Sequence, residues 1–363
     1  MPLESVPSTM KFAHKNQSPF FLGLKAEVEA YLQQQGKTRF GEGRIVAKGL
    51  FFFSLLLVSH LGIYLWANAW WQYAVCFVGA GLAAVLIVFN IVHDASHKAI
   101  SRHKSINTLF RYLGDFVGIN TYIWDIRHNL QHHTFTNVLG GDLIIENIPI
   151  LRLSPHQPHH RFHRYQAFYA PLLYAFYSAY WILVIDFKLF FLKEICNLKN
   201  IRHSRQEWFT LFFFKAVYLT YAVVLPTLFT PLSGWQVMGL FMLGHAVAGL
   251  LLSIVAALGH FVEGPDFPKP IGEELPTSWA EHELATSIDF APRSRFAHWI
   301  TGGLNTHVAH HLFPRMCHTH YYRVTQVIAK YCQQHGYPYH QESFLSAVQS
   351  HFRYLNRLGK VTA

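Results

Sequence analysis

The sequence contains few charged residues and few cysteines. Of its 363 residues, only 14% are Asp, Glu, Lys or Arg, whereas 51% are hydrophobic. Charged residues make up about a quarter of an ordinary soluble chain, so this composition argues against a soluble or disordered protein and favours a membrane protein. The four cysteines lie far apart without a CxxC pair, which argues against a disulfide framework and a thiolate zinc site. Any bound metal must therefore be held by other side chains.

The remaining charge is predominantly basic. Thirty Lys and Arg residues stand against 20 Asp and Glu, which gives a formal net charge of +10. The basic residues are not clustered with aromatic residues on one short element, as nucleic-acid binding would require. In a chain this apolar, the excess of basic residues is better explained as cytoplasmic charge that faces anionic lipid.

Two long spans contain no charged residue. One runs over 49–93 and the other over 216–262, each about 45 residues long. At about 1.5 Å per residue, a helix of that length would reach roughly twice the ~30 Å hydrocarbon thickness of a bilayer. We therefore predict that each span is a helical hairpin, with breaks at Asn68–Gln72 and Pro231–Trp235. The four predicted spans are about 49–67, 72–92, 210–230 and 236–260.

Basic residues flank the first hairpin on both sides. By the positive-inside tendency, this pattern predicts that both termini and the long middle segment are cytoplasmic. The first 48 residues contain charged and polar stretches and no pattern of a cleavable signal peptide. We therefore predict an integral protein of a bacterial inner membrane or the endoplasmic reticulum, with its polar segments on the cytoplasmic side.

Histidine is abundant, with 25 residues, and three clusters stand out. The first, His93 and His97, follows the first hairpin with i, i+4 spacing, which places two imidazoles on one helical face where they can share a metal. The second is His128, His132 and His133, and the third is His307, His310 and His311. One metal needs three or four protein ligands, so eight imidazoles predict two metals with positions left for oxygen or water. Nitrogen ligation suits iron, copper or zinc, and redox chemistry on a buried apolar substrate favours iron.

The three clusters can meet only if they face the same side of the membrane. Two crossings between His133 and His307 satisfy this condition, whereas a third crossing would not. A third apolar stretch, Ala167–Ile185, is rich in tyrosine and contains Pro171. We therefore predict that it is an interfacial helix over about 167–190.

These predictions together describe an all-α integral membrane protein. Four transmembrane helices form two hairpins, and a cytosolic helical cap holds the histidine-rich di-iron site. The predicted divisions are a cytosolic N-terminal segment over 1–48, a membrane domain over 49–324 and a cytosolic C-terminal segment over 325–363.

Other histidines have to be separated from the clusters. The segment His156–His160 imitates the third cluster, but Pro155 and Pro158 forbid a regular helix there, so a solvated loop is expected. His245 lies about 22 Å along a helix from His260, too deep to share the site. His260, at the cytoplasmic end of the last span, is a ninth candidate ligand. Further histidines are assigned other roles: His60 lies within a span, and surface or outer-sphere roles are expected for His103, His318 and His320.

Hydrogen-bonding side chains near the clusters are candidates to orient the ligand rings. The alternative for these residues is ordinary capping of helix ends. The candidates lie within or just after the clusters and are Asp94, Asn129, Asn137, Asp142 and Asn305.

The clusters resemble the three histidine boxes of the membrane fatty acid desaturases. The matching segments are His93–His97, His128–Thr134 with Thr136 and Asn137, and Gly302–Pro314, and the resemblance covers roughly Gly49–Val324. It implies a four-span fold with a cytosolic di-iron site, in which the eight box histidines and a histidine at the end of the last span bind iron. It also implies a reaction in which O2 and two electrons convert a methylene pair of an acyl-CoA or acyl lipid into a double bond. The acyl chain is expected to enter a narrow apolar tunnel among the span ends.

The third box is most similar to front-end desaturases and related bacterial acyl-CoA desaturases, many of which have Gln where this chain has His307. The position of the double bond is therefore left open. The sequence contains no His-Pro-Gly-Gly haem motif, so a separate carrier of the cytochrome b5 or ferredoxin type is expected to supply electrons.

Two other classes of function remain as alternatives. Hydroxylases, ketolases and alkane monooxygenases use the same boxes, and analysis of the product separates them from desaturases. A metal transporter would place its ligands at mid-membrane, but these clusters lie outside the charge-free spans. A bis-histidine haem electron carrier would show a strong Soret band.

Overall fold

The computed structural model describes residues 10–14, 18–146, 149–196 and 198–360. Five of its helical runs are long and apolar enough to cross a membrane, which indicates an integral membrane protein. These runs are Gly43–Leu65, Trp70–Ser96, Arg161–Phe190, Arg205–Phe229 and Gly234–Leu258.

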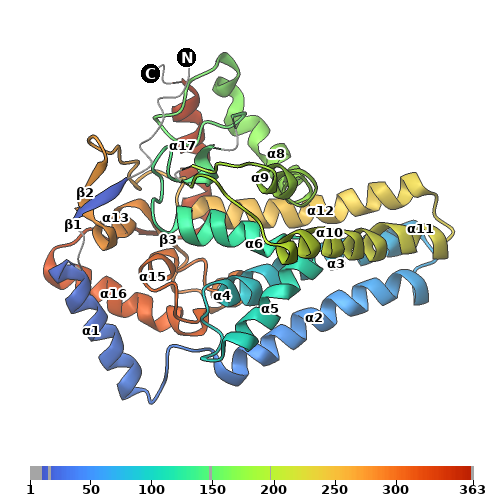
Figure 1. Ribbon diagram of the computed structural model, residues 1–363, viewed down its shortest axis with the longest axis horizontal. Helices are drawn as coiled ribbons and strands as arrows, with labels where there is room; N and C mark the ends of the chain where they lie inside the picture. Colours follow the sequence, from blue (N-terminus) through green and yellow to red (C-terminus); the bar gives the residue numbers. More distant parts are fainter. Residues whose placement is uncertain (1–9, 15–17, 147–148, 197, 361–363) are drawn as a thin grey trace.

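Four of the runs form one bundle, which extends to the right in Figure 1. Each charge-free span divides into two helices, and the divisions lie at 66–69 and 230–233, close to the predicted breaks. Wider π-helical turns interrupt two of these runs. The elements are α2 (Glu42–Leu65), α3 (Trp70–Ile87), η1 (Val88–Val92), α4 (His93–Ser96), α10 (Arg205–Leu219), η5 (Thr220–Val224), α11 (Leu225–Phe229) and α12 (Gly234–Leu258).

The fifth run does not lie parallel to this bundle but crosses it, packing against α12 (Figure 1). It contains Pro171 and exposes a row of large apolar side chains, among them Phe168 and Leu172. By length and composition it is also a candidate span, so its interfacial position remains a prediction. The run consists of η3 (Arg161–Tyr165), α8 (Gln166–Tyr180), η4 (Trp181–Ile185) and α9 (Asp186–Phe190).

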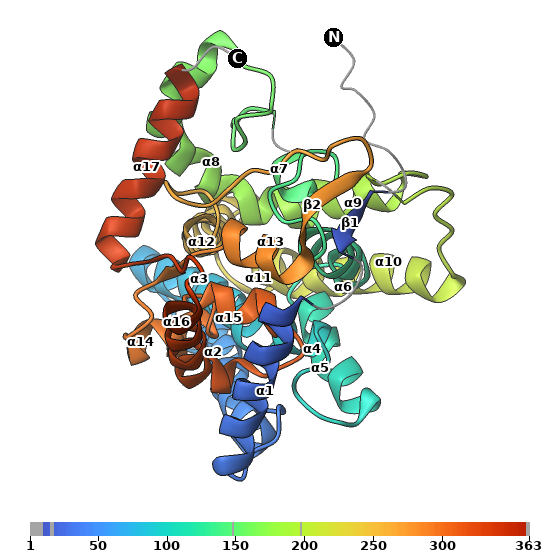
Figure 2. The same ribbon diagram turned by 90° about the vertical axis from the view of Figure 1, so that its left-hand side faces the viewer.

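Shorter elements gather at one end of the bundle and cover it, as Figure 2 shows from that side. The N-terminal helix α1 packs against α16 and α13, and the C-terminal helix α17 packs against α8, so both helices belong to the packed body. These elements are α1 (Pro19–Gln34), α5 (Lys104–Phe116), α6 (Thr121–Trp124), η2 (Asp125–His132), α7 (Leu143–Glu146), α13 (Trp279–Thr286), α14 (Arg295–Thr301), α15 (His307–Leu312), η6 (His318–His320), α16 (Tyr321–His335) and α17 (Phe344–Lys360).

The prediction of an all-α fold is incomplete, because the described residues also form two small parallel sheets. Strand β1 (Lys11–His14) pairs with β2 (Glu274–Ser278), and β3 (Asp289–Phe290) pairs with β4 (Gln341–Glu342). Each sheet joins segments far apart in the sequence, so neither strand pairing could be predicted from the local sequence. The first pairing is reinforced by an ion pair between Lys11 and Glu274.

Candidate metal centre

The fold brings all nine histidines of the predicted ligand set into one buried region. They come from the end of the α3 run, from η2, from the end of α12 and from α15. The convergence depends on close backbone packing. A side chain at Gly259 would collide with the His307 ring, and one at Gly302, where φ is +62°, would lie 2.2 Å from the Phe89 carbonyl oxygen. Glycine at these two positions lets the third box lie against the ends of α12 and η1.

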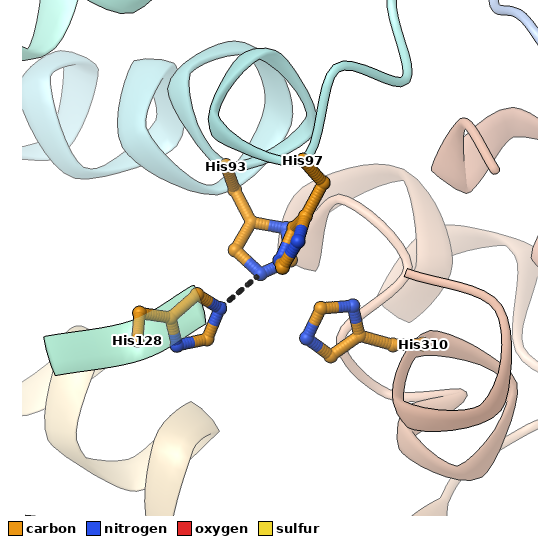
Figure 3. A group of neighbouring side chains, drawn as sticks. All are labelled: His93, His97, His128 and His310. Atoms are coloured by element: carbon orange, nitrogen blue, oxygen red, sulfur yellow. Dashed lines mark hydrogen bonds between the residues drawn. The ribbon is translucent and has the colours of Figure 1, made fainter. Parts of the chain in front are cut away.

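Four histidines form the first group, drawn in Figure 3. His93 and His97 project from the same helical turn, His128 approaches from η2, and His310 approaches from α15. One nitrogen from each ring lies within 4.8 Å of the others. The Nε2 atoms of His93 and His128 are 3.1 Å apart. The arrangement has the number and type of donors that a nitrogen-ligated metal requires.

A second group of four lies beside the first and consists of His132, His260, His307 and His311. The Nε2 atoms of His260 and His307 are 2.7 Å apart. His133 lies between the two groups, with a ring nitrogen within 4.8 Å of ligand atoms of both His310 and His311. Equal spacing in the sequence therefore does not put two histidines in the same group. His93 and His97 belong to one group, whereas His128 and His132, which have the same i, i+4 spacing, belong to different groups.

The rings of the second group are all oriented by oxygen acceptors. The Nδ1 atoms of His132 and His311 lie 2.9 Å and 2.6 Å from carboxylate oxygens of Asp142 and Glu283. The remaining two contacts are to backbone carbonyls: His260 Nδ1 lies 2.9 Å from Thr286 O, and His307 Nδ1 lies 3.1 Å from Leu304 O. Because an acceptor at Nδ1 fixes the proton there, Nε2 keeps its lone pair for a metal.

Burial also favours the metal-binding form of these histidines. It lowers the pKa of His260 to about 3, and it lowers the pKa values of His307 and His310 well below the usual range. The same effect, reinforced by neighbouring histidines, applies to His128 and His133. Neutral imidazole is the protonation state that binds metal, and several buried ring nitrogens, including His311 Nε2 and both nitrogens of His310, have no hydrogen-bond partner among the described residues. The donor set therefore fits a metal site made of neutral imidazoles.

Of the five predicted orienting residues, Asp142 contacts a ligand ring. Burial opposes ionisation of Asp142, but His132 and two backbone N–H groups together hold the pKa of this carboxyl below its usual value. Asn137 donates its backbone N–H to Asp142 and its side-chain amide to Thr286 O and Asp266 O, so it supports the acceptors rather than a ring.

The other three predicted orienting residues make different contacts. Asp94 accepts from the backbone N–H and Nδ1 of His318, whereas His93 Nδ1 is 3.9 Å from its carboxylate. Asn129 donates to Ser96 O and to Asp125, and Asn305 donates to Ala291 O. The two amides thus tie together the backbone around the boxes without contacting a ligand ring.

The acceptors that sequence reasoning missed are Glu283 and the carbonyls of Thr286 and Leu304. Glu283 lies in α13, 24 residues before His307, and no spacing rule connects it with the boxes. Carbonyl acceptors have no sequence signal, because every residue carries one. These contacts arise from the way the segment after α12 folds back over the histidines.

Histidines assigned to other roles lie outside the two groups. His245 is buried in the bundle, 2.7 Å from Tyr218 Oη and 2.9 Å from Ser178 Oγ, and His60 Nδ1 lies 3.0 Å from Leu56 O. The segment 156–160 is a loop, as predicted. His318 is buried and binds Asp94, whereas His103 is exposed and His320 contacts Phe40 O.

An apolar cavity adjoins the histidine groups. Its wall includes His93 and His128 from the first group and His132, His260 and His307 from the second. It shares the wall residues Val88, Trp181 and Leu252 with a cavity inside the helix bundle, and Ile144, Tyr177, Ala256 and Phe261 with a wider cavity beside α8. The three cavities are thus arranged in series, with the histidines beside the middle one.

Comparison with known proteins identifies the family. Residues 68–343 match the fatty acid desaturase family model. The chain belongs to the fatty acid desaturase family. Its relatives include the sn-1 linoleoyl-lipid 6-desaturase of Synechocystis sp., 32% identical over 93% of this chain and 95% of the relative. The acyl-lipid (8-3)-desaturase of Physcomitrium patens is 28% identical over 97% of this chain and 74% of the relative.

Family membership settles the class of activity. The protein is an oxidoreductase that desaturates fatty acyl chains, as the three boxes indicated. The histidine clusters of this desaturase are compatible with a metal site, and its substrate is an acyl lipid. The resemblance to front-end desaturases is supported by relatives named for activity near the carboxyl end, among them a probable Delta(5) fatty acid desaturase of Dictyostelium discoideum, 26% identical over 97% of this chain and 79% of the relative.

Proposed function

We propose that the protein binds two iron ions through the nine histidines and uses O2 to desaturate the acyl chain of a membrane lipid near its carboxyl end. The observation that carries this proposal is the position of the two histidine groups on the wall of one apolar cavity. In this assignment His93, His97, His128 and His310 hold one ion, His132, His260, His307 and His311 hold the other, and His133 lies between them. Iron supplies the activation of O2 and the removal of hydrogen.

The protein's own contribution is orientation and exclusion of water. The cavity beside the histidines is lined mainly by apolar and aromatic side chains, including Phe89, Trp124 and Leu304. The methylene groups of an acyl chain inside it are held by packing, so the shape of the passage sets the path of the chain past the histidines. No acid or base from the protein is required to polarise such a substrate.

The lipid substrate and the position of the double bond are supported by the relatives' names. These include a linoleoyl-lipid 6-desaturase and acyl-lipid (8-3)-desaturases. The cavity beside α8 supports the same proposal, because its wall residues Phe176 and Tyr180 belong to the exposed apolar face of that helix. An acyl chain can therefore enter sideways from the bilayer.

We further propose that the site faces the cytoplasm and receives electrons from a separate carrier of the cytochrome b5 or ferredoxin type. The net charge of +10 supports docking of an acidic protein. With four spans and an interfacial Ala167–Ile185, as proposed, all three boxes would lie on one side of the membrane. The basic residues that flank the first hairpin support the assignment of that side to the cytoplasm.

The test is to express the chain in a host with its own electron donors and to feed saturated and unsaturated fatty acids. Total lipid is then analysed by gas chromatography–mass spectrometry after derivatisation of double bonds. A new double bond near the carboxyl end, together with about two iron ions per purified chain, is the expected result. An oxygenated product at the same carbons would instead assign the protein to the hydroxylases, and a new double bond counted from the methyl end would refute the proposed position.

A further inference from the structure

Apart from the histidines, the wall of the middle cavity is mainly apolar and aromatic, but it includes one arginine. Arg127 precedes His128 in η2 and is 5% exposed, and it belongs to the wall of the middle cavity. Burying a guanidinium is costly unless its donors and its charge are compensated. Because the guanidinium is buried, it requires a polar partner.

The protein compensates this guanidinium only in part. Arg127 Nη2 donates to the Tyr177 hydroxyl, and the guanidinium carbon lies 5.3 Å from the centre of the Trp181 ring and 5.9 Å from that of Tyr177. Across the described ranges, no carboxylate lies within 4.0 Å of Arg127. Asp186, on the same helical run, is already bound by Lys215, Trp181 and the Asn120 backbone N–H. Arginine carries five N–H donors, so this one has donors available to a ligand in the cavity.

The position of Arg127 along the passage indicates which ligand atom it meets. Its partner Tyr177 belongs to both the cavity beside α8 and the middle cavity, whereas Trp181 belongs to both the middle cavity and the cavity in the bundle. The cavity beside α8 has a volume of about 480 Å³, and the one in the bundle about 70 Å³. A polar headgroup requires the larger cavity, whose wall residues Phe176 and Tyr180 also belong to the exposed face of α8, and a methyl terminus fits the smaller cavity. The carboxyl-derived end of the acyl chain therefore lies on the Tyr177 side.

We propose that Arg127 binds the carbonyl oxygen of the substrate's acyl ester and thereby fixes which carbons lie beside the histidines. This inference rests on the proposed function, in which Arg127 would position the substrate. The ester carbonyl is the oxygen attached directly to the acyl chain, so it is the group that reaches furthest into the passage. With the carbonyl held beside Tyr177, the double bond forms at a fixed number of carbons from the carboxyl end, whatever the length of the methyl end.

The test compares two lipids with the purified iron-loaded protein in nanodiscs, supplied with an electron donor. One is a phosphatidylcholine with a linoleoyl ester at sn-1, and the other carries the same chain in an ether link, which lacks the carbonyl. We expect the wild-type protein to desaturate the ester at least about tenfold faster than the ether, because a charge-assisted hydrogen bond is lost. In Arg127→Gln the ester should fall to the ether's rate and give a double bond at more than one position. Arg127→Lys, which keeps a charged donor, should recover part of the ester preference.

Arg161→Gln is the matched control, because Arg161 is exposed and lines none of these cavities. It should keep both the ester preference and the single product. Equal rates for ester and ether in the wild-type protein would overturn the proposal, even if Arg127→Gln failed to fold. An unchanged ester preference in iron-loaded Arg127→Gln would also overturn it. If the wild-type protein desaturates neither lipid, the proposed function itself fails.

Discussion

The two histidine groups differ in how their rings are held. In the second group, every Nδ1 faces an oxygen acceptor, two of them carboxylates. In the first group, the described part of the chain gives no ring a hydrogen bond to an oxygen; the nearest carboxylate, that of Asp94, is 3.9 Å from His93 Nδ1. Acceptors fix the tautomer and raise the basicity of a ligand. If each group holds one iron ion, as proposed, the second group would hold its ion more firmly, and the first would leave its rings more freedom.

This difference has a structural origin. The second group lies under the segment between α12 and α15, which supplies Glu283 and the Thr286 and Leu304 carbonyls. The first group includes His93 of α4, and the neighbouring carboxylate in that helix, Asp94, accepts from His318 instead of from a ring of the group. The following experiments test the comparison in order of decreasing effect.

The largest effect is expected from removing one ligand from either group. His132→Ala and His310→Ala should each lower turnover by more than about 100-fold, since loss of a ligand exceeds the 10–100-fold effect of an outer-sphere change. Each variant should also lose bound iron, measured on the purified protein. His103→Ala, which alters an exposed histidine, is the control and should retain both. Substantial turnover by either ligand variant would argue against the proposed site.

An intermediate effect is expected from removing the carboxylates of the second group. Asp142→Asn and Glu283→Gln should each lower iron affinity or turnover by about 10–100-fold, because His132 and His311 lose the acceptor that orients them. Turnover and iron content at limiting iron measure this effect. Asn305→Ala is a suitable control, because this amide contacts backbone and Thr301 rather than a ligand ring. If both carboxylate variants kept the wild-type affinity for iron, the acceptors would not distinguish the second histidine group from the first.

Chelation should separate the two groups directly. We expect an iron chelator to remove one ion per chain quickly and the second slowly, because the second group is anchored by four acceptors. In Asp142→Asn the slow phase should accelerate towards the fast one, while the fast phase stays unchanged. Iron content followed over time checks this prediction. Loss of both ions in one phase from the wild-type protein would show that the two groups hold iron equally well.

The sequence predicted which histidines come together better than it predicted their surroundings. The eight box histidines and His260 were recognisable because spacing and proximity to span ends are local properties, and the fold brings all nine together. Their division into groups was not readable, because His128 and His132 have the same spacing as His93 and His97 but meet different partners. Glu283 was missed because its contact with His311 joins residues 28 positions apart through a fold-back that no local pattern signals.

The overall architecture shows the same limit. The breaks in the two charge-free spans were predicted within a few residues, since polar and turn-forming residues interrupt an apolar run visibly. Strand β1 was not predicted, because its partner β2 lies more than 250 residues away and each strand is too short to show an alternating pattern. Arg127 was overlooked for a related reason: in the sequence it is one basic residue beside a box, and only the packed cavity shows that its charge is buried.

The smallest effect is expected at Asp94, the acid closest in sequence to the first group. Because its carboxylate accepts from the His318 backbone and ring rather than from a ligand, Asp94→Asn should lower turnover by less than the tenfold minimum expected for an orienting residue. The rate of the fast chelation phase should stay at its wild-type value. A loss as large as that of Asp142→Asn would mean that Asp94 orients His93 once iron is bound, and the two groups would then be held alike. The ratio of the two variants' effects thus measures how unequal the groups are.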